Sequence, residues 1–273
     1  MRYAHIISAL RSTKWAAKES VIVSIRDLLQ SRLTQSHALA PAIQAPRLQG
    51  LLGGSATRST VGVVEISGII GKRLDSMETE CGGCDLDSVE ADIRNAVADP
   101  LVKSIVLYFD SPGGSVTGVP ELADKIRSWT KEKPIYAYTT TMMCSAAYWL
   151  ASACSGVFAA GSSDVGSIGV YMAWLDCSEM YAKEGLKLEL IKAGARKGEG
   201  IEGSSLSDET RTAWQAEVDS LWQQFKSAVL IDRPGVPEPA MQGQSLMGTD
   251  AKAAGLVDEV IPDLATLISE LGG

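Results

Sequence analysis

Histidine is almost absent from this chain of 273 residues. The two histidines, His5 and His37, both lie near the amino terminus. A metal centre built from several imidazoles is therefore not expected, and a Ser-His-Asp triad would depend on one of these early side chains. We interpret both histidines as incidental to catalysis. A nucleophile later in the chain would need a base of another kind.

Positive charge is also scarce. The chain has 25 Lys and Arg residues against 33 Asp and Glu residues, giving a formal net charge of −8. Proteins that bind nucleic acids usually carry a basic surface that neutralises phosphates. The composition therefore argues against a nucleic-acid partner.

The five cysteines are too few, and odd in number, for a disulfide scaffold in a chain of this length. Reduced cysteines fit a cytoplasmic setting. Cys81 and Cys84 have CxxC spacing, but a structural zinc ion would need a second pair of ligands. We interpret the pair as free thiols in a tight loop, with a redox or metal role as the alternatives. We expect no metal and no cofactor.

A hydrophobic run that could cross a membrane is not evident. Charged residues interrupt any apolar core of an amino-terminal signal. Residues 134–163 carry no charge and are long enough to span a bilayer, but they are rich in Thr, Ser and Gly. We read them as a buried strand, a turn, a buried helix and another strand, and we expect no integral membrane segment.

The chain divides into an amino-terminal extension, residues 1–58, and one domain, residues 59–273. The extension contains a predicted helix at 20–33 and a linker at 37–57 that is rich in Ala, Pro, Gly and Ser. Within the domain, a continuous apolar strand at 104–109 is followed by a turn, a helix at 116–129 and a strand at 135–140. This order indicates a βαβ unit and an α/β fold with a parallel sheet.

Periodicity predicts further elements in the same domain. The long helix at 207–230 carries an apolar stripe that we assign to the core or to a subunit interface. The other predicted strands are 61–66, 157–160, 168–174, 187–191 and 256–260, and the other predicted helices are 87–98, 145–153, 178–184, 249–254 and a final one.

The turn Asp110-Ser-Pro-Gly-Gly-Ser115 lies between a buried strand and a helix. Glycine permits a sharp turn with exposed backbone N–H groups, and such groups can bind a phosphate or stabilise an oxyanion. Neither GxxxxGK[ST] nor GxGxxG is present. The oxyanion interpretation is therefore favoured over the phosphate one, and a purely structural turn is the alternative.

Ser145 lies where a strand meets a helix of small residues, in Cys144-Ser-Ala-Ala-Tyr-Trp149. This arrangement resembles the mechanics of a nucleophile elbow, although GxSxG is absent. The simpler interpretation is that Ser145 caps the helix. A lysine can act as the base for such a serine when its amine is neutral. From the residues alone, two lysines are comparable candidates for the base. They are Lys197, in a glycine-rich loop, and Lys192, at the end of the predicted strand before that loop.

Five segments together resemble, in order, the signal peptide peptidase A family of serine peptidases. The resemblance covers residues 61–261 and implies the ClpP/crotonase fold, a repeated ββα superhelix with a parallel sheet. The segments are Asp110-Ser-Pro-Gly-Gly-Ser-Val116, Cys144-Ser-Ala-Ala-Tyr-Trp149, Asp164-Val-Gly-Ser-Ile-Gly-Val170, Ile191-Lys-Ala-Gly-Ala-Arg-Lys197 and Gly255-Leu-Val-Asp258.

The resemblance assigns roles to five residues. It makes Ser145 the nucleophile, Lys197 the general base and Ser167 the residue that holds the lysine amine, with the N–H groups of Gly114 and Ala146 as the oxyanion hole. The sequence departs from the family at Cys144 and Ala146, where glycine often flanks the serine.

The opening residues and the turn at Cys81 are similar to those of phage and prophage members of the family. That similarity implies a cytoplasmic endopeptidase that processes scaffold and capsid proteins, and the family forms homo-oligomeric rings. The alternatives are a peptidase that degrades cleaved signal peptides, a crotonase-like acyl-CoA enzyme and an inactive assembly module. Retention of Ser145, Ser167 and Lys197 together argues against the last.

Overall fold

The computed structural model describes residues 15–17 and 60–272. Its α/β architecture, with mostly parallel strand pairs, confirms the predicted fold class. The predicted helix at 20–33, the linker at 37–57, His5 and His37 lie outside the described residues. In the described part, no helix is long and apolar enough to cross a membrane.

The larger sheet is built around three parallel strands, β2 (Val61–Ser67), β5 (Ser104–Ser111) and β7 (Ile135–Cys144). The first half of β7 pairs with β8 (Gly156–Ala159), and its end pairs with β9 (Asp164–Gly166). Two short strands complete this sheet: β10 (Ser245–Met247), antiparallel to β9, and β11 (Glu259–Val260), parallel to β8.

A smaller sheet lies beside the carboxyl end of β5. Its strand order is β1-β6-β3-β4. The strands are β1 (Trp15–Ala17), β3 (Ile69–Gly71), β4 (Gly83–Asp85) and β6 (Gly113–Ser115). The expected turn at 110–115 is therefore partly a strand, because Gly113–Ser115 have neighbouring strands on both sides.

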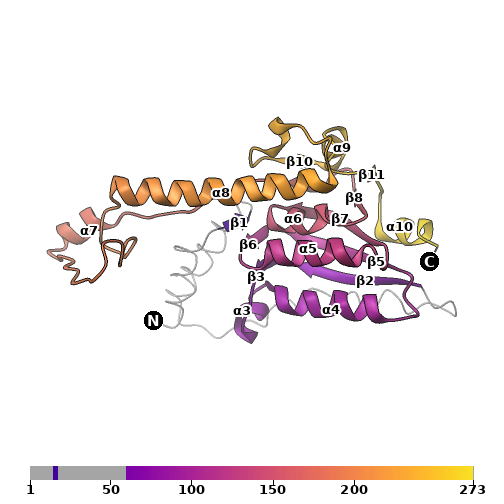
Figure 1. The fold of residues 1–273 in the computed structure, drawn as a ribbon, viewed down its shortest axis with the longest axis horizontal. Coiled ribbons are helices and arrows are strands. Elements are labelled where there is room, and N and C mark those ends of the chain that lie inside the picture. The colour runs from indigo at the N-terminus through magenta and orange to yellow at the C-terminus, as the bar shows by residue number, and fades with distance from the viewer. Residues whose placement is uncertain (1–14, 18–59, 273) are drawn as a thin grey trace.

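Helices cover both faces of the larger sheet. Alternate side chains of β5 point to opposite faces, so Leu107 joins the core under the helices while Val106 joins a second cluster with Tyr138 and Leu267. Helices α4, α5 and α6 are stacked along one face (Figure 1). The helices are α3 (Ser76–Glu80), α4 (Leu86–Ala98), α5 (Val119–Trp129), α6 (Ala146–Ser152), α7 (Ser178–Lys183), α8 (Asp208–Asp232), the 3-10 helix η2 (Glu238–Met241), α9 (Gly248–Ala253) and α10 (Leu264–Glu270).

Two predicted strands are wrong, and a third is much shorter than predicted. Residues 168–174 leave the sheet after β9 and form only an isolated bridge at Tyr171. Residues 187–191 alternate polar and apolar side chains as a strand does, but they are irregular and exposed, because no described strand lies beside them. Of the strand predicted at 256–260, only Glu259–Val260 pairs.

Helix α8 is anchored to the core at one end only. The rings of Trp149 on α6 and Phe225 on α8 stack with centroids 4.4 Å apart, and both side chains are buried. The amino-terminal half of α8 extends past the sheet towards α7 (Figure 1). The 25 residues of α8 span about 37 Å. The projecting part, residues 175–214, is called the arm below.

Replacing Phe225 with alanine should lower the free energy of unfolding by about 3–5 kcal/mol, because a fully buried ring and its stacking partner are lost. Chemical denaturation with far-UV circular dichroism measures the change. Leu230→Ala on the same helix is the control, since Leu230 is partly exposed. Equal losses in the two variants would contradict the assigned anchor.

Candidate active site

The carboxyl ends of three neighbouring strands bring the predicted site serines together. Strand β7 is paired with β5 at Met143 and Ser111, and with β9 at Cys144 and Gly166. Ser145 and Ser167 directly follow this last pair, and the backbone N–H of Ser145 donates to Gly166 O at 2.7 Å. The register therefore sets Ser145 between the Pro-Gly-Gly segment on one side and Ser167 on the other.

Ser145 has a strained backbone. Its φ of 54° and ψ of −119° lie outside the regions that L-residues favour, a conformation that costs about 1–3 kcal/mol. It occupies the N-cap position of α6, but its side chain makes no capping hydrogen bond. Ser145 Oγ instead lies 3.5 Å from Gly169 O. The side chain is not used as a helix cap, and the geometry is that of a nucleophile elbow without flanking glycines.

The predicted oxyanion donors lie on adjoining elements. Gly114 is the middle residue of β6, which contacts α6, and Ala146 is the first residue of α6. N–H groups in the first turn of a helix have no partner within that helix. Gly114 also has a steric reason to be glycine, because a Cβ atom there would lie 2.0 Å from Ile70 O.

Ser111 was not singled out from the sequence, yet it anchors the Pro-Gly-Gly segment. Its buried hydroxyl donates to Gly68 O at 2.6 Å and accepts from the Gly113 N–H at 3.2 Å. These bonds tie the end of β5 to the turn between β2 and β3. The one available signal was a serine directly before Pro-Gly-Gly, and serine is a common turn residue with many other uses.

Ser167 is also held in a positive-φ conformation, with φ of 53°. Its backbone N–H donates to Gln244 O at 2.8 Å, and its hydroxyl donates to Gly243 O at 3.2 Å. A hydroxyl that donates to a carbonyl keeps lone pairs with which it can accept from an amine. Nothing in the sequence indicated Gly243 and Gln244, because their backbone carbonyls make these contacts.

Lys197 is not brought to Ser145 within this chain. It lies in the arm, where its side chain is exposed and its amine has no hydrogen-bond partner among the described residues. The loop that carries Lys197 packs against the projecting part of α8, because a Cβ atom on Gly200 would come 2.5 Å from the Trp214 ring. Trp214 lies eleven residues before the buried Phe225 on α8, which is about 16 Å along the helix axis. The rival Lys192 donates its amine proton to Ala195 O at 2.6 Å.

The CxxC pair shows no sign of acting as a unit. Cys81 is exposed and follows α3, whereas Cys84 is buried in β4, and both are free thiols. Burial raises the pKa of the Cys84 thiol to about 12, which disfavours the thiolate that metal binding and redox exchange require. No group of three or more potential metal ligands occurs in the described part of the chain.

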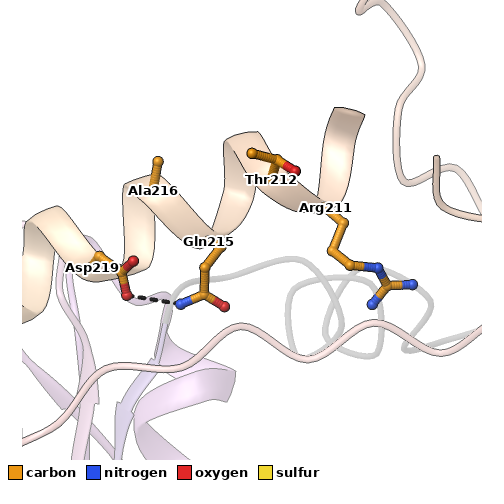
Figure 2. Close-up of a pocket in the computed structure, with 5 residues that line it drawn as sticks. All are labelled: Arg211, Thr212, Gln215, Ala216 and Asp219. Carbon is orange, nitrogen blue, oxygen red and sulfur yellow. Dashed lines mark hydrogen bonds between the residues drawn. The ribbon is translucent and has the colours of Figure 1, made fainter. Parts of the chain in front are cut away.

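A surface pocket on α8 lies apart from these residues. It is lined by one face of the helix, and Gln215 Nε2 donates to Asp219 Oδ1 at 2.8 Å across it (Figure 2). None of the predicted site residues is among its lining residues. We assign it no catalytic role. Its lining residues are Arg211, Thr212, Gln215, Ala216 and Asp219.

Comparison with known proteins identifies a matching family and similar phage proteins. The model of peptidase family S49 matches residues 127–269. Among similar proteins, the head-tail preconnector protein GP5 of Enterobacteria phage P21 is 33% identical over 204 residues, covering 74% of this chain and 40% of its own length. The capsid assembly protease C of Escherichia phage lambda is 31% identical over 203 residues, covering 74% of this chain and 46% of that protein.

Cellular proteases are similar as well. Protease 4 of Salmonella typhi is 29% identical over 208 residues, which cover 75% of this chain and 33% of that protein. The chain thus spans less than half the length of these relatives. The matched family region includes Ser145, Ser167 and Lys197. With a family match over more than half of its residues, the chain belongs to peptidase family S49, a family of serine peptidases.

Proposed function

We propose that this protein is a serine endopeptidase in which Ser145 is the nucleophile and Lys197 is the general base. The observation that carries the proposal is the strained backbone of Ser145, whose hydroxyl caps no helix and lies between β6 and Ser167. Strain at a buried serine is retained where the surrounding structure fixes it, and such residues cluster at active sites.

The proposed reaction is acyl transfer to Ser145. The neutral amine of Lys197 accepts the Ser145 proton while Oγ bonds to the carbonyl carbon of the peptide. The N–H groups of Gly114 and Ala146 stabilise the oxyanion that forms. The Lys197 ammonium then protonates the leaving amine, the C–N bond breaks, and water releases the acyl group from Ser145. Ser167 accepts a hydrogen bond from the lysine and orients it.

A second copy of the chain is the proposed source of the lysine. Lys197 is exposed on the arm, and the arm presents several uncovered apolar side chains around it. Ile191 is 97% exposed, and Leu186 and Leu188 alternate with the charged residues Lys187 and Glu189 in a strand-like pattern without a described partner. A monomer rarely leaves such a surface in water. Packing the arm on a neighbouring subunit would cover it, and a homo-oligomeric ring would repeat that contact at every site.

The proposed substrates are capsid or scaffold proteins during phage head assembly, in the host cytoplasm or in the procapsid. The support is the pair of similar phage proteins, one named a capsid assembly protease and the other a head-tail preconnector protein. Co-expression with the neighbouring capsid genes tests the role. We expect new, shorter capsid or scaffold bands with the wild type, and none with Ser145→Ala. Identical bands in the two cultures would contradict it.

Cleavage of signal peptides is the second candidate, because the relatives also include a protein named putative signal peptide peptidase SppA, from Enterococcus faecium. Peptide-library cleavage compares the two substrate classes directly. An acyl-CoA enzyme is the alternative from another reaction class. Covalent labelling of Ser145 by a fluorophosphonate would support the peptidase, whereas an unlabelled Ser145 would favour the acyl-CoA enzyme.

A further inference from the structure

Strand β1 occupies the edge of β6 beside the candidate oxyanion hole. It runs antiparallel to β6, with Ala16 opposite Gly114 and Ala17 opposite Gly113. The opposite edge of β6 is taken by β3, which pairs with it at Ile70. Because β3 takes one edge of β6, a further strand could pair with β6 only at the other edge. Within the described residues, β1 covers that other edge (Figure 1).

A peptide substrate would need this same edge. If Gly114 and Ala146 bind the carbonyl oxygen of the scissile bond, the substrate backbone must pass directly along β6 on its way to Ser145. Extended peptides commonly bind by adding a strand to an exposed sheet edge, where main-chain hydrogen bonds supply affinity. The substrate and β1 would then compete for the same backbone groups.

The site is also closed in this structure. Ser145 is 1% exposed, and Gly113, Gly114 and Ala146 are buried. A serine that attacks a peptide carbonyl must become accessible to it. A buried serine and a strand paired along β6 are both expected when a peptide segment occupies the substrate site. Here β1 is that segment.

We propose that Trp15–Ala17 is a built-in competitor that holds the peptide-binding edge of β6 until substrate displaces it. The inference rests on the proposed peptidase function. A competitor within the same chain reduces the fraction of molecules that can bind substrate, so it raises the apparent KM and leaves kcat unchanged.

The test is a pair of double variants in the full chain. Alternate residues of an antiparallel strand direct their N–H groups to the partner, so Ala16→Pro/Ala17→Pro removes a ladder donor whichever residue supplies it. The control is Ala16→Ser/Ala17→Ser, which keeps both N–H groups. Cleavage of a fluorogenic peptide with alanine at the scissile bond gives kcat and KM, and fluorophosphonate labelling counts reactive Ser145.

The proline variant should lower KM by roughly tenfold at unchanged kcat, if β1 holds the edge in about nine molecules of ten. A synthetic peptide of residues 12–20 should raise the KM of that variant again, and the serine variant should match the wild type. An unchanged KM, or a higher one, in a proline variant with the wild-type unfolding midpoint would overturn the inference. If neither the wild type nor the proline variant cleaves the peptide or is labelled at Ser145, the proposed peptidase function is overturned as well.

Discussion

Replacing Ser145 with alanine is expected to reduce kcat for peptide cleavage by at least about 10³-fold, because no acyl-enzyme can form without the nucleophile. Binding of the peptide should change little, since Oγ makes only a 3.5 Å contact to Gly169 O. Initial rates on a fluorogenic peptide give kcat, and the fluorescence anisotropy of a labelled peptide analogue that resists cleavage gives the binding affinity.

Ser152→Ala is the matched control for that experiment. Ser152 lies on the same helix, is equally buried, and donates its hydroxyl proton to Trp149 O at 2.8 Å. Its loss removes one local hydrogen bond, worth about 1 kcal/mol, and should leave kcat near the wild-type value. If Ser145→Ala kept most of its activity, or if Ser152→Ala lost as much, Ser145 would not be the nucleophile.

Replacing Lys197 with alanine is expected to cause a loss of kcat similar to that of Ser145→Ala, because residues that act as one catalytic unit are not additive. Lys192→Ala is the control, since Lys192 is the nearby rival and already donates to Ala195 O. Measuring kcat for both variants on one peptide decides between them. A full loss in Lys192→Ala with activity retained in Lys197→Ala would reverse the assignment.

Mixing the two inactive proteins tests whether the base comes from a second copy. If Ser145→Ala and Lys197→Ala subunits are unfolded together in equal amounts and refolded, sites that combine an intact serine with an intact lysine should form. Random assembly predicts about a quarter of the wild-type activity, because each site draws its two residues from different subunits. A base supplied within the same chain would leave the mixture inactive. The two variants refolded separately provide the baseline.

The local pattern of the sequence predicted the elements that carry the site. The apolar strand at 104–109 and the strand-to-helix junction at Ser145 are present in the structure, whereas the turn expected at 110–115 ends in strand β6, which contains both glycines. Their periodicity and turn chemistry act over a few residues, so short-range reasoning was sufficient. The predicted roles of all five site residues remain predictions, including that of Ser145 as the nucleophile. Gly114, Ala146 and Ser167 lie around Ser145, whereas Lys197 does not.

The errors arose where pairing depends on distant segments. Residues 187–191 alternate like a strand but have no described neighbour, whereas the unpredicted β3, β4 and β10 form because partners reach them from elsewhere in the chain. A strand needs a second strand to satisfy its backbone groups, and no window of sequence contains that information. The exposed apolar side chains that alternate with charged ones at 187–191 support the proposed contact between subunits.

The sequence by itself determined which side chains are available for catalysis. Its two histidines, both near the amino terminus, argue against a His-based site, and its acidic balance argues against nucleic-acid binding, while the serine with a lysine base remains a prediction from the family resemblance. Only the tertiary structure decided that Ser145 and Ser167 are neighbours, that β1 covers β6, and that Lys197 stands apart on the arm. The physical reason is that strand register and one-ended anchoring of α8 are set by contacts between residues far apart in the chain.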